Sequence, residues 1–145
     1  RYILGLMNCT RTGGWVLSNG TCRGAGTRDV APLRLDAGIS DKVARPYAWL
    51  IASRRLCNHY YDGGPADRLR RAGYTSYKWA ENLGGCGSND PYVSALRTHL
   101  YFQSEGYDGV HGHYRNMMNA LYDRAGIGAV KVNGTFRFVV DFYHP

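Results

Sequence analysis

The stretch GIGAVKVNGTFRFVVDFYHP, residues 126–145, carries the clearest structural signal in the chain. Two runs of strand-forming residues flank Asn133-Gly134, a pair that is typical of the two-residue type I′ turn of a β-hairpin. Large apolar side chains occupy every second position of the second run: Phe136, Phe138, Val140 and Phe142. This alternation predicts a strand whose aromatic side faces a core, and it places a small antiparallel sheet late in the chain.

Helical patterns precede the hairpin. Residues 35–56 repeat apolar side chains at helical spacing, and Pro46 within them predicts a kink or a division in two. Shorter helices are expected at residues 65–73 and 113–122. Residues 91–105 predict a further helix with Tyr92, Leu96 and Leu100 along one face and with Val93, His99 and Gln103 beside it.

Two other segments complete the expected order of elements. Residues 74–85 are rich in aromatic and β-favouring side chains, which predicts a strand that runs into a loop. Residues 8–31 are rich in Gly, Thr, Ser and Asn, and we expect a disulfide-pinned loop there after a short starting helix. The sum is three or four helices with a small sheet, an α+β fold.

Length and composition indicate a single globular domain, residues 1–145. Hydrophobic residues make up 44% of the chain and charged residues 20%, which is ordinary for a folded domain. No window approaches the roughly 18 consecutive apolar residues of a membrane span. The net charge is +7, but the densest basic cluster is only Arg68, Arg70 and Arg71. We interpret that cluster as a solvated basic face and expect no specific nucleic-acid partner.

Four cysteines stand at positions 9, 22, 57 and 86, without a C-x-x-C pair. They allow three pairings. The local pairing joins Cys9 to Cys22 and leaves Cys57 to Cys86 as the long-range bridge. Two disulfides would indicate an oxidising compartment and a secreted protein, whereas the alternative is four buried reduced thiols.

Common catalytic motifs such as G-x-S-x-G, the phosphate-binding G-x-x-x-x-G-K-[ST] and H-E-x-x-H are missing from the sequence. The candidates that remain are His and Glu residues at the ends of elements: His59, Glu81, Glu105, His111 and His113. Such a set suits Zn²⁺ and could activate water. The alternative is a group of ordinary surface carboxylates and hydrogen-bonded loop histidines.

The cysteines add a geometric argument for one pair among these candidates. Cys57 lies two residues before His59, and Cys86 lies five residues after Glu81. A Cys57–Cys86 bridge would bring the two segments together. We therefore predict a His59/Glu81 pair.

The order of short motifs is more specific than any one of them. LMNCTR, APLRLD, VARPYA, CNHYY, WAENLGG, QSE, GHYRNMMN, GIGAV and DFYHP follow one another along the chain. This order resembles the CAP superfamily of cysteine-rich secretory proteins, venom antigens and plant pathogenesis-related proteins, also called the SCP domain. The likeness runs from about Leu4 to Pro145 and is greatest to the compact bacterial secreted branch.

The resemblance implies a three-layer α-β-α sandwich with a central antiparallel sheet of three to four strands. It also implies a cleft with two histidines and two glutamates, which fall on His59, Glu81, Glu105 and His113. In many relatives the histidines bind Zn²⁺ or another divalent ion, and the glutamates bond to the histidines. Tyr60 and Ala80 depart from the family pattern beside these residues, so we expect the metal to bind weakly.

We therefore expect a secreted, extracellular CAP domain that holds a divalent metal, zinc being the expected ion, at His59 and His113. The expected partner is an extracellular ligand, lipid, glycan or protein, and the expected state is a monomer or weak dimer. The alternative is a metal-dependent hydrolase or peptidase in which Glu81 or Glu105 acts as general base.

His111 and His113 are one residue apart. On extended backbone their side chains would point to opposite sides, which places His111 at the rim rather than in the cleft.

Overall fold

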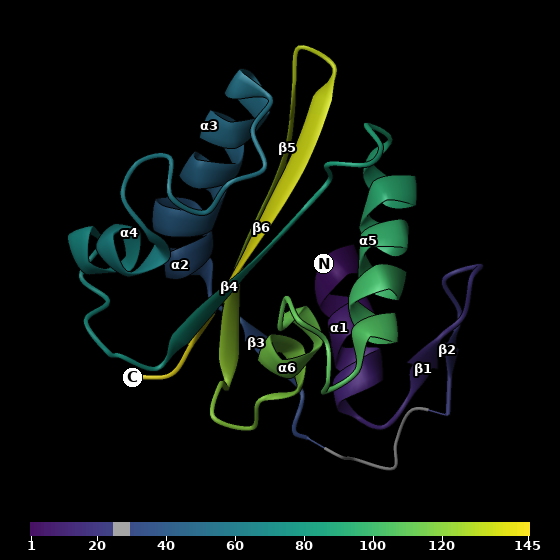
Figure 1. Cartoon of the computed structure of the whole chain (residues 1–145). Helices are drawn as coiled ribbons and strands as arrows, with labels where there is room; N and C mark the ends of the chain where they lie inside the picture. The colour runs from purple at the N-terminus through teal and green to yellow at the C-terminus, as the bar shows by residue number, and fades with distance from the viewer. Residues whose placement is uncertain (25–29) are drawn as a thin grey trace.

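The computed structural model describes residues 1–24 and 30–145, with a four-stranded sheet between two layers of helices (Figure 1). One layer contains α2 (Ala37–Ile39), the π-helical segment η1 (Ser40–Ala44), α3 (Arg45–Arg54) and α4 (Pro65–Arg71). The other layer contains α1 (Tyr2–Arg11), α5 (Pro91–Glu105) and α6 (His113–Met118). The arrangement confirms the predicted three-layer α+β sandwich.

The strands of the sheet lie in the order β3-β5-β6-β4. They are β3 (Arg34–Leu35), β5 (Arg124–Val132), β6 (Thr135–Tyr143) and β4 (Trp79–Gly84). The three longer strands are antiparallel, as expected, whereas the two-residue β3 pairs with β5 in parallel, so the sheet is mixed. A separate ribbon joins β1 (Trp15–Val16) to β2 (Cys22–Arg23).

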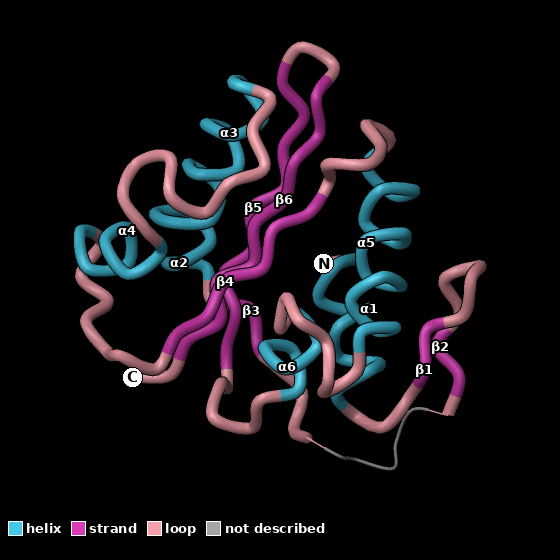
Figure 2. The backbone as a smooth tube through the Cα atoms, viewed as in Figure 1, coloured by secondary structure: helices cyan, strands magenta, loops and turns pink. Residues whose placement is uncertain are grey.

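The predicted hairpin is confirmed. Asn133 and Gly134 both have positive φ, 47° and 82°, as a type I′ turn requires. Figure 2 shows the hairpin of β5 and β6 running between the two helical layers. All nine residues of β6 are buried, because the strand has neighbours on both edges and helices on both faces. The aromatic side of β6 does face a core, but the other side is covered as well.

Two glycines of the opening stretch let the helices approach the sheet. A Cβ atom at Gly128 would lie 2.3 Å from the backbone nitrogen of Arg45, and one at Gly126 would lie 2.3 Å from Cγ2 of Ile39. Any larger residue at these positions would therefore push the helical layer away from β5.

The expected helix over residues 35–56 is divided. Asp36 caps α2 by accepting a hydrogen bond from the amide of Ile39. The wider π-helical turn η1 follows, directly before the helix α3 that contains Pro46, a residue with no amide hydrogen to donate. Proline therefore interrupts the regular helix, as predicted, and α3 ends at Arg54.

Residues 8–31 are less loop-like than predicted. Helix α1 continues to Arg11, so Cys9 lies within a helix, and β1 and β2 follow. Residues 25–29 of the predicted loop lie outside the described residues. Both expected disulfides, Cys9–Cys22 and Cys57–Cys86, are present.

Helix α5 has the predicted bounds, and Leu96 and Leu100 of the predicted face are half-buried against the cluster of Leu6, Cys9 and Val16. Tyr92 is 69% exposed, whereas His99 and Gln103 are buried. Thr10 on α1 donates a hydrogen bond to Gln103 and accepts one from the imidazole of His99, so a polar network fixes which side of α5 faces inward. A periodicity of apolar residues alone does not reveal such a network.

Arg11 connects α1 to α6 through hydrogen bonds. Arg11 is 1% exposed, and within the described residues its guanidinium donates hydrogen bonds only to backbone carbonyls, those of Ala31, Met117, Asn119 and Tyr122. Burial lowers the pKa of Arg11 to about 10. The carbonyl of Met117 lies at the end of α6, where a cation is favourable, so the end of that short helix depends on Arg11.

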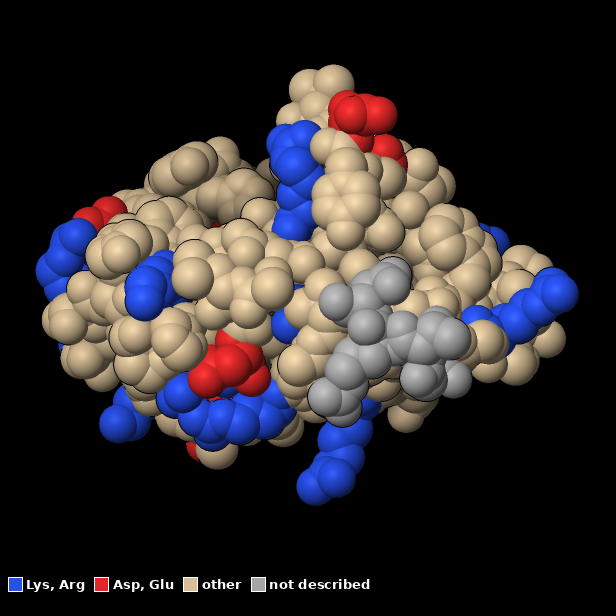
Figure 3. Space-filling view, turned by 90° about the horizontal axis from the view of Figure 1, so that it is seen from below, with Lys and Arg blue, Asp and Glu red and all other residues tan. Residues whose placement is uncertain are grey.

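The molecular surface carries its positive charge in separate groups. On the face seen in Figure 3, lysine and arginine side chains are interrupted by uncharged surface and by acidic groups. None of the described helices is long and apolar enough to cross a membrane.

Candidate functional site

His59 lies in the loop between α3 and α4, and contacts from several elements fix that loop. The Cys57–Cys86 disulfide attaches it to the end of β4. The hydroxyl of Tyr47 on α3 donates to the carbonyl of Asn58, and Arg68 on α4 donates to the carbonyl of His59. The imidazole is 34% exposed, so a fixed backbone presents a ring that solvent can reach.

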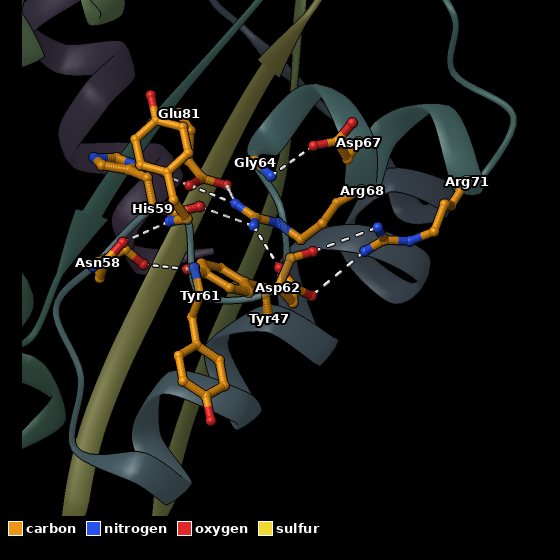
Figure 4. Close-up of polar contacts among 11 residues, drawn as sticks. Tyr47, Asn58, His59, Tyr61, Asp62, Gly64, Asp67, Arg68, Arg71 and Glu81 are labelled. Atoms are coloured by element: carbon orange, nitrogen blue, oxygen red, sulfur yellow. Dashed lines mark hydrogen bonds and ion pairs between the residues drawn. The ribbon is translucent and has the colours of Figure 1, made fainter.

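Glu81 on β4 is the partner of His59. Its Oε1 atom lies 2.8 Å from Nδ1 of His59, and its side chain is 1% exposed. The guanidinium of Arg68 binds both oxygens of Glu81, at 2.8 and 2.7 Å, and packs 3.4 Å from the ring centre of Tyr47 (Figure 4). Arg68 also donates to Asp62 at 2.8 Å. The predicted His59/Glu81 pair is therefore present, inside a larger charged cluster.

Asp141 lies directly across from Glu81 in the register of β4 and β6 and is completely buried. Burial, together with the negative charge of Glu81, raises the pKa of Asp141 well above its usual range. Burial also acts to raise the pKa of Glu81, but the hydrogen bond from His59 and the charge and hydrogen bonds of Arg68 outweigh it and lower that pKa. Burial therefore favours the neutral acid at Asp141, whereas Arg68 and His59 favour the carboxylate at Glu81.

His113 and Glu105 form a second pair on the other helical layer. Glu105 is the last residue of α5, and His113 is the first of α6. The Nδ1 atom of His113 lies 2.6 Å from Oε1 of Glu105, and its amide donates to Oε2 at 3.2 Å. The ring of Phe102 stacks on the imidazole with centroids 4.1 Å apart. The imidazole of His113 is 18% exposed, so it is less accessible than that of His59.

Asn82 links β4 to the second pair. It follows Glu81 on the strand, is 1% exposed, and donates a hydrogen bond to the carbonyl of His113. Asn116, one turn after His113 on α6, donates to the side chain of Asn82. Asn116 also lines an open pocket of about 280 Å³ together with His59, Tyr60 and Glu81. The pocket is thus lined by the first pair and by Asn116 of α6, the helix that begins with His113.

The expected separation of His111 from His113 was wrong. Gly112 has a φ of 75°, so the backbone turns instead of extending, and the two imidazole rings lie 5.8 Å apart. His111 is nevertheless exposed, at the surface of the loop before α6.

A carboxylate beside Nδ1 fixes the tautomer of each paired histidine, because Nδ1 must carry the proton that the carboxylate accepts. The lone pair is then on Nε2 in both rings. Across residues 1–24 and 30–145, no three His, Cys, Asp or Glu side chains form a group able to hold a metal ion. The arrangement therefore offers single imidazole ligands, each oriented by a carboxylate, rather than a complete metal cage.

Sequence reasoning missed three residues of this site: Arg68, Asn82 and Asp141. The cluster that contains Arg68 was interpreted as a solvated basic face, but Arg68 is 5% exposed. Its neighbours Arg70 and Arg71 do have exposed side chains. The sequence of β6 contained a signal for Asp141, since an acidic side chain between the apolar residues Val140 and Phe142 of a strand needs a partner.

The fold and the paired imidazoles define a class of α-β-α domain. In this class, two histidine–carboxylate pairs lie beside one strand, β4, one pair toward each helical layer. The family model of the cysteine-rich secretory protein family, CAP, matches residues 5–142, and the chain belongs to this family. A search of curated proteins found no match.

Two solved structures share the fold. One is an extracellular protein containing an SCP domain from Bacillus anthracis, with 18% identity and a TM-score of 0.62. The match covers 81% of this chain and 35% of that one, so this chain spans about a third of that protein's length. The other is an outer surface protein from Borrelia burgdorferi, with 20% identity, a TM-score of 0.63, and coverage of 79% and 78%.

Proposed function

We propose that this chain is a secreted CAP domain that binds a divalent cation, zinc, weakly through Nε2 of His59 and His113 and uses the surrounding pocket to bind an extracellular ligand. One observation supports the metal most directly. Both imidazoles have Nδ1 engaged by a carboxylate that is itself almost completely buried. This is the arrangement that orients histidine ligands in metal proteins and makes them more basic.

The residues present fit such an ion only as a partial set of ligands. Two imidazoles are fewer than the three protein ligands that are usual at catalytic zinc, so water or a bound ligand would complete the coordination. Weak binding follows from this count. When bound, the ion would supply a positive centre in the pocket that attracts an anionic or carbonyl group of a ligand.

The alternative, a hydrolase with a glutamate as general base, is disfavoured by the hydrogen bonds. Both oxygens of Glu81 accept from Arg68, and both oxygens of Glu105 accept from His113. The pKa of Glu81 is also lowered, which makes this carboxylate a weaker base. We therefore favour binding over catalysis.

Secretion is supported by the two disulfides, which are typical of oxidising compartments. The two structural neighbours, an extracellular protein and an outer surface protein, point the same way. The exposed side chain of Tyr60, beside His59 in the pocket, offers a contact for a glycan, lipid or protein.

Calorimetry with Zn²⁺ at about pH 7.5 and about pH 5.5 tests the metal, because imidazole protonates near pH ~6.5 and then cannot bind it. We expect measurable heat at the higher pH, weaker binding at the lower, and loss of binding in the His59→Ala/His113→Ala variant. The matched control is His111→Ala, which should bind like the parent. Equal binding by the double variant, or no heat at about 1 mM Zn²⁺, would overturn the proposal.

Hydrolysis is tested separately with a library of peptides and esters, with and without added Zn²⁺. We expect no turnover. Zinc-dependent turnover that disappears in the Glu81→Gln or Glu105→Gln variant would restore the hydrolase hypothesis.

A further inference from the structure

The outer edge of β5 is covered over only part of its length. Strand β3 pairs with Arg124 and Ala125 and goes no further. Next along the edge, the hydroxyl of Ser40 accepts a hydrogen bond from the amide of Ile127. These contacts occupy the backbone groups at the beginning of β5 that point away from β6.

The direction of the remaining groups follows from the hairpin register. Val132 and Thr135 flank the two-residue turn and exchange both hydrogen bonds, so every second residue back from Val132 faces β6. The residues between them face outward, which agrees with the contacts of Ala125 and Ile127. The N–H and C=O groups of Ala129 and Lys131 therefore point away from the sheet, and within the described chain no residue pairs with them.

An open pocket of about 710 Å³ lies along this unpaired edge. Ala129 and Lys131 line it from β5, Arg45 lines it from α3, and Tyr92 lines it from α5. Its volume is within the range of roughly 300–1,000 Å³ that is usual for ligand sites. An unpaired strand edge in an open pocket of this size can accept one more strand.

The charge of the pocket selects what it can accept. Arg1, Arg45 and Lys131 line it together with a single acid, Asp41, which already forms an ion pair with Arg45. Apolar side chains form another part of the wall: Ile3, Leu35, Tyr92 and Phe136. In an extended segment that alternates acidic and apolar residues, the acidic side chains would face the cations and the apolar side chains would face this wall.

We propose that the edge of β5 binds an extended acidic peptide segment of a partner protein by β-strand addition. The peptide backbone pairs with Ala129 and Lys131, and its carboxylates pair with the side chains of Arg1 and Lys131. In the order β3-β5-β6-β4, this edge is on the opposite side of the sheet from Glu81. The peptide site is therefore separate from the histidine site, and it does not rest on the proposed metal.

The test uses an acetylated and amidated Glu-Val-Glu-Val-Glu peptide, titrated into the whole chain and followed by NMR. We expect the amides of Ala129 and Lys131 to shift and to exchange more slowly with solvent. Versions of the peptide with methylated backbone amides keep the side chains but cannot donate, so at least one should bind about tenfold more weakly. A Lys-Val-Lys-Val-Lys peptide should not bind.

Ala129→Pro is the decisive variant, because it removes an outward amide hydrogen and no bond to β6. It should weaken the acidic peptide several-fold, whereas the matched control Ala129→Ser should bind like the parent. Lys131→Glu provides a second test that does not depend on proline being tolerated, since it should weaken the acidic peptide and strengthen the basic one.

Three results would overturn the proposal. The first is no amide shift at about 1 mM peptide. The second is binding that is unchanged in both Ala129→Pro and Lys131→Glu. The third is dimerisation of the chain that Ala129→Pro abolishes, because the occupant of the edge would then be a second copy of the chain.

Discussion

His59–Glu81 and His113–Glu105 share one hydrogen-bond pattern and differ in everything around it. The Nδ1–oxygen distances are 2.8 and 2.6 Å, and both carboxylates are almost fully buried. Glu81, however, comes from the edge strand β4 and has a buried arginine as its second partner. Glu105 comes from a helix end, and its second partner is the backbone amide of the same histidine.

The difference separates two ways of fixing an imidazole. The first pair depends on a cluster of polar and charged side chains from α3, α4, β4 and β6. A substitution of any one of them therefore alters the contacts of the others. The second pair depends on local geometry, because Glu105 and His113 are only eight residues apart. We therefore expect variants of the first pair to affect the stability of the whole domain, and variants of the second to affect mainly the site.

The largest expected effect comes from comparing Glu81→Gln with Glu105→Gln. The first leaves the buried Arg68 without its main counter-charge and should lower the free energy of unfolding by about 3 kcal/mol or more. The second removes one charge-assisted hydrogen bond and should lower it by about 1 kcal/mol. Denaturant unfolding near neutral pH measures both, and equal losses would contradict the comparison.

His99 allows a test of the helical layer that carries Glu105. Burial lowers its pKa to about 4, below the ordinary value of 6.5. The unfolded chain therefore takes up a proton first as the pH falls, and stability is lost between about pH 6.5 and pH 4, by about 3 kcal/mol in total. In a His99→Gln variant this loss should disappear. Thermal or denaturant unfolding across the same pH window measures it, and an unchanged pH profile would argue against a neutral buried imidazole.

Asp141 lies on β6, opposite Glu81 of the first pair, and the pH dependence expected from it has the opposite sign. Its raised pKa means that the native state keeps a proton which the unfolded chain releases above about pH 4. Stability should fall by about 1.4 kcal/mol for each pH unit from there up to the raised pKa. Asp141→Asn should remove this fall, so the stability of the variant relative to that of the parent should increase as the pH rises. A parent whose stability is flat over this range would show that Asp141 is ionised.

The smallest expected effect is local to the second pair. Gly112 has a φ of 75°, and a Cβ there would lie 3.0 Å from the side chain of Arg115, so Gly112→Ala should lower stability by about 1 kcal/mol. The control is Gly5→Ala in α1, where nothing lies within 4 Å and stability should rise by about 0.5–1 kcal/mol. Calorimetry with Zn²⁺ on the same Gly112 variant shows whether the strain reaches His113.

Features fixed by neighbouring residues were predictable from the sequence. The hairpin follows from Asn133-Gly134 and an alternating strand, and the division of residues 35–56 follows from Pro46. The pairing of His59 with Glu81 followed from the two cysteines that flank them, because a disulfide turns a distant contact into a short one. For these features, the spacing of residue types along the chain is enough to determine the local structure.

Features that depend on what packs across the fold were not predictable. Arg68, Arg70 and Arg71 look equivalent in the sequence, and only their position relative to β4 makes one of them a buried partner of Glu81. The turn at Gly112 brought His111 beside His113, because a positive φ at one residue changes the direction of the next side chain. The buried polar residues His99 and Gln103 of α5 are paired with Thr10, which is on another helix.

The contacts of Arg11 also set the order in which this domain can assemble. The guanidinium binds carbonyl groups 106 to 111 residues further along the chain. During synthesis, α1 is therefore made long before α6 and the carbonyl groups that Arg11 binds. Until those residues are made, the apolar side of α1 is exposed. Strand β6 is made later still, although it is central to the sheet. We therefore expect the early part of the chain to have no stable structure by itself, and the placement of His113 to be among the last steps of folding.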